Sequence, residues 1–226
     1  MSFRQVLHRQ SAVGNQDPIP SFVNDAGLAG ASTGPPLARK VENFLAFQAA
    51  WAAVVVSAAH GVPWIGAVVV AAAIVGHVAR AAVPRTEMGL VAIVTLIGVA
   101  FEILRLQLHD IDYVSGQPMH SLPPYWLILL WSAFSTTLNL GLRWLHRHLF
   151  WAAALGSIAG PLSFLAGVRL GAAQFIDVRS ALGSLAFAWA ILTPILMALA
   201  RRFDGVAKRG LRRDTGACPD HANTRG

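Results

Sequence analysis

The sequence predicts an all-α, polytopic membrane protein, a bundle of about six transmembrane helices with both termini on the cytoplasmic side. Three observations lead to this fold class. The apolar residues come in blocks of about 18 to 22, the length that crosses a hydrocarbon core ~30 Å thick. Only 13% of the 226 residues are charged, roughly half the share in a soluble domain. The basic residues gather in alternate connections between the blocks.

We expect six spans, each taken from one apolar block. They are Asn43–His60, Trp64–Arg80, Met88–Leu108, Tyr125–Leu142, Leu149–Gly167 and Ala181–Ala200. The blocks lack the alternation of polar and apolar residues that a transmembrane strand needs, so helices are favoured over a barrel. Aromatic residues near block ends, such as Trp64 and Trp144, suit the boundary between membrane and water.

The blocks divide the chain into three parts. Residues 1–40 are rich in Pro, Gly, Ser, Asn and Asp, and we predict a disordered cytoplasmic extension there. Residues 41–202 form the predicted transmembrane domain, and residues 203–226 a disordered, basic cytoplasmic tail. We expect the tail to contact anionic lipid headgroups at the cytoplasmic face through Lys208, Arg209, Arg212 and Arg213.

The distribution of Lys and Arg predicts the orientation. Basic residues precede the first span, follow the second, separate the fourth from the fifth and close the sixth: Arg39, Lys40, Arg80, Arg85, Arg143, Arg147, Arg201 and Arg202. The connections between them are poor in bases, and residues 109–124 contain none. Basic loops stay inside, so we predict a multi-pass protein of a bacterial inner membrane, surrounded by the lipid bilayer. Because the net charge of +7 follows this pattern, we predict no nucleic-acid binding.

Three stretches together resemble a known family. They are NFLAFQAAW (43–51), PPYWLILLWSAFSTTLNLGLRW (123–144) and GPLSFLAGVRLG (160–171). They resemble an uncharacterised bacterial inner-membrane family, domain of unknown function 2878, over about residues 41–202. The resemblance implies no established activity. Members of that family often occur near genes for membrane-lipid modification and oxidative stress, so the resemblance implies a link to membrane-lipid or envelope homeostasis.

The third predicted span carries ionisable residues, which cost about 2.5–3.5 kcal/mol each at a membrane centre and are therefore functional candidates. Thr95, Gly98, Glu102, Arg105 and His109 recur at steps of three and four and share one helix face. Glu102 and Arg105 have the spacing of an ion pair. Either this pair is structural, or Glu102, Arg105 and His109 form a catalytic, proton-relay or headgroup-binding site.

Two further patterns predict helix packing. Ser132, Ser135, Thr136 and Asn139 form a polar stripe on the fourth span, where such side chains commonly bond a neighbouring helix. The fifth span has small residues at the spacing that allows close helix approach and could meet a partner helix: Gly156, Gly160, Gly167 and Gly171.

Metal binding is the weakest of the predicted sites. His109, Asp110, Asp112 and His120 offer nitrogen and oxygen ligands in one loop, although unrelated solvated loop groups are the preferred interpretation. The sequence indicates no cofactor, and we interpret His77 with Arg80 as an anchor at the membrane surface. Cys218 is the only cysteine, which excludes a disulfide framework.

The sequence leaves three functions open. The first is a membrane protein with a non-catalytic role, which predicts that the polar stripes pack and leave no cavity. The second is a lipid-modifying enzyme, which predicts that Glu102 faces a cavity open to the lipid. The third is a small transporter, a class that commonly has inverted repeats; residues 43–108 and 125–200 show no such similarity.

Overall fold

The structure is a computed structural model, and it describes residues 35–206. The extension and tail that we predicted fall mostly at residues 1–34 and 207–226, which lie outside the described residues. The described part folds into six α-helices, a 3₁₀ helix and two short strands: α1 (Leu37–Ala59), α2 (Pro63–Ala79), α3 (Pro84–Gln107), β1 (Ile111–Tyr113), α4 (Tyr125–Leu138), η2 (Arg143–Arg147), α5 (Leu149–Arg169), β2 (Ala173–Phe175) and α6 (Val178–Arg202).

Each predicted apolar block overlaps one α-helix, so the helical fold class is confirmed. Four of the described helices, α1, α3, α5 and α6, are long and apolar enough to cross a membrane. The helix boundaries differ from the predicted ones. α1 begins at Leu37, directly after Pro36, and α4 ends at Leu138 because the chain turns there, with Leu142 N–H donating to Thr137 O. α2 and α4 are shorter, at 17 and 14 residues.

The two strands were not predicted. β1 and β2 pair antiparallel, with Ile111 opposite Phe175 and Tyr113 opposite Ala173. Strands of three residues are too short for a period to show in the sequence. Their pairing fastens the long connection after α3 to the short connection between α5 and α6, and thereby fixes the position of Tyr113.

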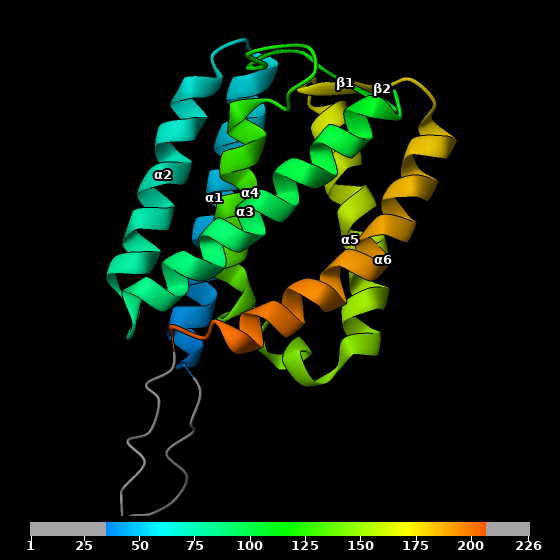
Figure 1. Cartoon of the computed structure of the whole chain (residues 1–226). Helices are drawn as coiled ribbons and strands as arrows, with labels where there is room; N and C mark the ends of the chain where they lie inside the picture. Colours follow the sequence, from blue (N-terminus) through cyan, green and yellow to red (C-terminus); the bar gives the residue numbers. More distant parts are fainter. Residues whose placement is uncertain (1–34, 207–226) are drawn as a thin grey trace, which may run out of the picture. The chain divides into compact units, whose positions relative to one another are not determined.

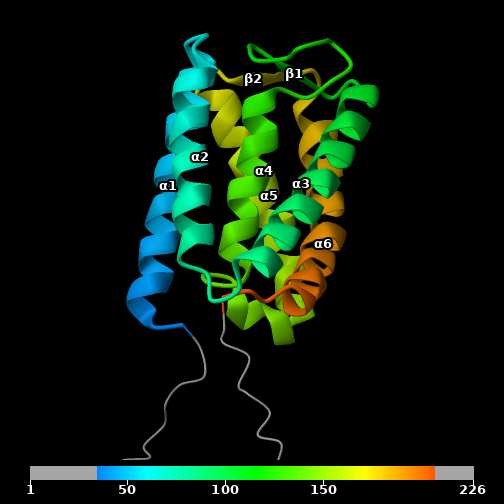
Figure 2. The same cartoon turned by 60° about the vertical axis from the view of Figure 1, so that its left-hand side comes forward.

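The helices end at two opposite ends of the bundle, shown in Figures 1 and 2. At the sheet end lie β1, β2 and the turn between α1 and α2, where Ser115 donates to Ala58 O over 2.7 Å. At the basic end lie the start of α1, the connection between α2 and α3, η2 and the end of α6. Arg39 bonds Arg80 O there over 3.1 Å, and Val83 N bonds Gly205 O over 2.8 Å.

α4 is the central helix of this bundle, in contact with α1, α2, α3 and α6. Its Trp131 stacks on Trp189 of α6, with 5.2 Å between ring centroids and a 10° interplanar angle. Phe101 and Phe134 contact both indole rings edge-on. The outer helices instead expose large apolar side chains, among them Phe44, Val68, Leu96, Phe150 and Phe187. An apolar exterior around a partly polar interior is the distribution that a lipid environment favours.

The glycines of α5 differ in their surroundings. A Cβ at Gly156 would lie 2.1 Å from Thr193 Oγ1, and one at Gly160 would lie 2.3 Å from the Trp189 ring. These two glycines therefore let α5 approach α6 closely. A Cβ at Gly167 would meet nothing within 4 Å. Gly171, with a φ of +88°, lies after the helix in the left-handed conformation that glycine favours.

Candidate functional site

Glu102 lies inside the bundle near the sheet end and is fully buried. Tyr113 of β1 donates its hydroxyl to Oε2 over 2.8 Å, and Trp131 of α4 donates Nε1–H to Oε1 over 3.0 Å. Each carboxylate oxygen therefore has one neutral donor, and the three residues join α3, β1 and α4. Burial, and then the Glu102 carboxylate, raise the pKa of Tyr113 well above its ordinary value. The phenol therefore keeps its proton and remains a donor.

Arg105 is 3% exposed and forms its ion pair with Asp110, with 2.9 Å between NH2 and Oδ1. Its guanidinium lies over the Phe164 ring of α5 at 5.3 Å. Ser184 of α6 donates to Asp110 Oδ2 over 3.0 Å. Nε and NH1 of Arg105 have no hydrogen-bond partner among the described residues. Arg105 and Asp110 thus connect the end of α3 to α5 and α6.

The prediction that Glu102 forms an ion pair with Arg105 is wrong, because Arg105 pairs with Asp110 instead. The ion pairs of residues 35–206 include Arg105 with Asp110 but not with Glu102. Helix α3 ends at Gln107, and the chain then turns back and brings Asp110 to the Arg105 guanidinium. Both carboxylate oxygens of Glu102 already accept hydrogen bonds from neutral donors. The charges of Glu102, Arg105 and Asp110 remain near enough to influence one another.

His109 does not join the other predicted catalytic candidates. It is exposed, its φ is +53°, and its Nδ1 lies 2.8 Å from Gln107 O. Because α3 ends at Gln107, the helical spacing that placed His109 on the Glu102 face no longer applies to it.

The four weak metal candidates are also separated. Asp110 is held by Arg105 and Ser184, whereas His109, Asp112 and His120 are exposed. Within residues 35–206 no three His, Cys, Asp or Glu side chains are close enough to hold a metal ion.

A narrow crevice opens beside Tyr113, between α1, α4 and α5. Trp51, Trp126, Ser163 and Phe164 line it together with Tyr113, and Trp51 Nε1–H donates to Ser163 Oγ over 3.2 Å. The lining is almost wholly apolar. Glu102 does not line this crevice; it reaches it only through its hydrogen bond with Tyr113.

The polar stripe of α4 makes contacts in three directions. Thr95 of α3 and Ser132 share a hydrogen bond of 2.7 Å. Ser135 and Thr136 donate to carbonyls of their own helix, Ser132 O and Ala133 O. Asn139 Nδ2 donates to Glu87 Oε2 over 3.2 Å and to Phe203 O over 2.9 Å. The stripe therefore holds neighbouring elements against α4.

Glu87 is the centre of a second buried cluster, at the basic end, which sequence reasoning missed. His77 Nε2 lies 2.8 Å from Oε1. Asn139 Nδ2 and Gly205 N each lie 3.2 Å from Oε2. The carboxylate thus connects α2, α3, α4 and the segment after α6. Glu87 lies one residue before the predicted span at Met88, and for that reason it was not counted among the intramembrane acids.

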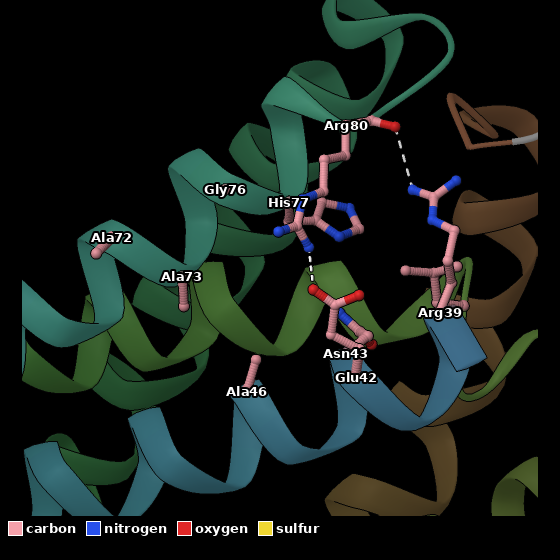
Figure 3. A pocket seen from close by; sticks show the side chains of 10 residues that line it. Arg39, Glu42, Asn43, Ala46, Ala72, Ala73, Gly76, His77 and Arg80 are labelled. Atoms are coloured by element: carbon pink, nitrogen blue, oxygen red, sulfur yellow. Dashed lines mark hydrogen bonds and ion pairs between the residues drawn. The ribbon is translucent and has the colours of Figure 1, made fainter. Parts of the chain in front are cut away.

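A pocket of about 240 Å³ lies next to this cluster, between α1 and α2 (Figure 3). Its charged and polar lining consists of Arg39, Glu42, Asn43, His77 and Arg80. Arg80 and Glu42 form an ion pair across the pocket mouth, and both side chains are more than half exposed. The sequence shows that His77 and Arg80 are one helical turn apart, but it does not predict that α1 packs opposite them.

The four long apolar helices and the apolar side chains exposed on the outer helices are those expected of a helical membrane protein. Within this class, residues 40–195 match the model of the family described as "Protein of unknown function (DUF2878)". The chain belongs to this family, and the resemblance inferred from its motifs is confirmed. Searches of curated proteins and of solved structures gave no match.

Proposed function

We propose that the chain is a bacterial inner-membrane protein with six spans and both termini in the cytoplasm, and that it serves membrane-lipid or envelope homeostasis without catalysing a reaction. The observation that carries the non-catalytic role is the placement of Glu102 and Arg105. Both are buried, both are held by partners from other elements, and neither lines the crevice or the pocket. A group that contacts a substrate needs access to it.

The six-span topology is supported by how the short helices are placed. A helix of 14 residues extends about 21 Å, less than the ~30 Å of a hydrocarbon core. α4 has nine buried residues and is surrounded by other helices. Chain that is not helical is tolerated at membrane depth where protein covers it. α4 together with the turn that follows it can therefore complete a crossing inside the bundle.

The proposed orientation is supported by the basic residues. The basic end collects the basic residues at the start of α1, the end of α2, the start of α3, in η2 and at the end of α6: Arg39, Lys40, Arg80, Arg85, Arg143, Arg147, Arg201 and Arg202. The sheet end has fewer basic residues: Arg169 is the last residue of α5, and Arg179 lies in the first turn of α6. Such asymmetry places the basic end inside.

Alkaline phosphatase fusions test the topology. We expect activity for fusions at Gly61, Gly116 and Asp177, and none at Arg85, Arg147 and Lys208, because the enzyme is active only outside the inner membrane. The reverse result at two adjacent connections would remove the six-span arrangement.

A second candidate function, lipid modification at the crevice, is favoured by one observation. Tyr113 lines the crevice and donates to the buried Glu102, so the phenol beside this apolar opening is hydrogen-bonded to an acid. Lipid analysis of a deletion strain separates the two functions. A non-catalytic protein should leave every lipid species present and change only their proportions. Loss of one species, restored by the wild type and not by Tyr113→Phe, would establish the enzyme.

A further inference from the structure

The pocket at the basic end combines groups that bind an anion. Arg39 and Arg80 contribute two guanidinium groups, and Glu42 is the single carboxylate that lines it. Arg39 donates to Arg80 O, a contact that keeps the two arginines together at the mouth (Figure 3). Guanidinium groups bind phosphate oxygens through paired hydrogen bonds. Arg80 is paired with Glu42, so the lining keeps one unneutralised positive charge, that of Arg39, beside a second guanidinium group.

Asn43 adds a requirement for a donor on the ligand. The Thr136 hydroxyl donates to Ala133 O over 2.7 Å, so it can only accept from Asn43, whose Nδ2 lies 3.4 Å from Thr136 Oγ1. This fixes the orientation of the Asn43 amide. Its Oδ1 is buried and has no hydrogen-bond partner among the described residues. A buried acceptor without a donor is costly, and a ligand hydroxyl would satisfy it.

His77 presents a second hydrogen-bonding group to the pocket. A carboxylate only accepts, so His77 Nε2 carries the proton that it shares with Glu87 Oε1. Nδ1 then remains for the pocket, and no described residue bonds it. Glu87 itself is held by Asn139 and Gly205, which keeps the imidazole fixed in orientation.

We propose that this pocket binds a glycerol phosphate group: Arg39 and Arg80 contact the phosphate, and Asn43 and His77 contact the glycerol hydroxyls. This inference rests on the proposed function in one respect: a lipid can supply the glycerol phosphate group only if the protein lies in a membrane. Beside the start of α1 and the end of α2, a lipid headgroup with phosphoglycerol can reach the pocket from the membrane surface, and soluble glycerol phosphate can reach it from water.

Native mass spectrometry of the purified full chain in detergent tests the proposal. The probes are short-chain phosphatidylglycerol, phosphatidylmethanol, which has the same charge but no hydroxyl, and phosphatidylcholine. We expect phosphatidylglycerol to bind about tenfold more tightly than either of the other two, since a hydrogen bond that satisfies a buried, otherwise unpaired acceptor corresponds to about that factor. Displacement of bound phosphatidylglycerol by millimolar sn-glycerol 3-phosphate assigns the soluble source, and persistence of the lipid assigns the headgroup.

Matched variants connect the binding to the pocket. Arg39→Gln should weaken phosphatidylglycerol binding about tenfold, whereas Arg147→Gln, an exposed arginine of the same end, should not. Asn43→Ala should reduce the preference over phosphatidylmethanol, with the His77 contact remaining. Gly76 lines the pocket and a Cβ there meets nothing within 4 Å, as at Gly183 of α6. Gly76→Leu should therefore block binding without loss of folding, and Gly183→Leu should leave it intact.

Equal binding of the three lipids would overturn the proposal, as would equal effects of Arg39→Gln and Arg147→Gln. Thermal unfolding of each variant is measured in the same detergent. If Arg39→Gln or Asn43→Ala proves misfolded, binding by Gly76→Leu decides the test. A chain that binds as expected but shows reversed phosphatase fusions would refute the topology and leave the pocket standing. The two failures are therefore distinguishable.

Discussion

Glu102 accepts one hydrogen bond on each oxygen, from Trp131 and from Tyr113. A glutamine can keep both contacts, because its carbonyl accepts from the indole and its NH₂ donates to the phenol oxygen. We expect Glu102→Gln to change the free energy of unfolding by less than about 1 kcal/mol. Glu102→Ala leaves two buried donors unpaired and a cavity, so we expect a loss of roughly 2–5 kcal/mol. Unfolding in mixed detergent micelles measures both, and equal losses would show that the charge itself is needed.

Arg105 and Asp110 form the charged pair of the sheet end, and we expect a double-mutant cycle to show their coupling. Asp110→Asn alone leaves the Arg105 guanidinium buried without its counter-charge and should cost about 3–5 kcal/mol. With Arg105→Met in place, the same substitution should cost much less. The matched cycle of Arg105→Met with Glu102→Gln should show weaker coupling, since these side chains do not form an ion pair. Stronger coupling to Glu102 would contradict the structure.

His146 in η2 gives a pH dependence. It is buried, and Nε2–H donates to Leu138 O over 2.9 Å. Burial lowers the pKa of His146 below its ordinary value of about 6.5. The unfolded chain therefore takes up a proton more readily, so stability is full above about pH 6.5 and falls as the pH drops from there toward the lowered folded value.

We expect His146→Gln, which keeps a donor for Leu138 O, to flatten this acid loss of melting temperature between pH 7.5 and about pH 5. His148→Gln, at an exposed position two residues on, is the control. A variant curve as steep as that of the wild type would assign the acid loss to other groups.

The sequence singled out Glu102 and Arg105, which the structure buries, but it did not predict the side chains that they contact. Glu102 and Arg105 stood out because charge is rare in apolar blocks. Asp110 could not be assigned as the partner, since it lies beyond the end of α3, where helical spacing no longer relates residues. Glu87 and His77 are on different helices, and only tertiary packing brings them together.

Among the elements, α5 and α6 are in contact through glycine. We expect Gly156→Ala to lower the free energy of unfolding by about 1–3 kcal/mol, because a Cβ there overlaps the Trp189 carbonyl oxygen, a backbone atom that cannot turn aside. Gly167→Ala is the matched control. It enters open space on the same helix and should be neutral or stabilising by up to about 1 kcal/mol. Equal destabilisation by both substitutions would indicate a general intolerance of α5 instead of a close contact.

The α-helices were predictable because long apolar blocks have few alternatives in a membrane. The ends of the helices were less predictable. The start of α1 at Leu37 depends on Pro36, and α4 ends early because of a turn that lies inside the apolar block and has no signal in its composition. β1 and β2 could not be predicted, since neither strand is long enough to stand without the other.

For the whole molecule, the central position of α4 predicts a gradient of protection. We expect backbone amides of residues 125–138 to exchange hydrogen most slowly, and those of α2 and α5 faster, because α4 is surrounded by protein and its neighbours expose one side. Exchange followed by mass spectrometry in lipid nanodiscs measures this. Slower exchange in α5 than in α4 would contradict a bundle centred on α4.

The buried charges of α3 also affect how the chain is inserted into a membrane during its synthesis. In the proposed topology Glu87, Glu102 and Arg105 enter the membrane on α3. Trp131 of α4 and Asn139, which directly follows α4, bond the two acids and are synthesised later. A ribosome has to add some thirty further residues before α4 is complete. Until then α3 holds carboxylates that lipid cannot solvate. If the proposed six-span topology holds, the insertion machinery has reason to retain α3 and release it together with α4, so that a hairpin of two helices is the unit that enters the bilayer.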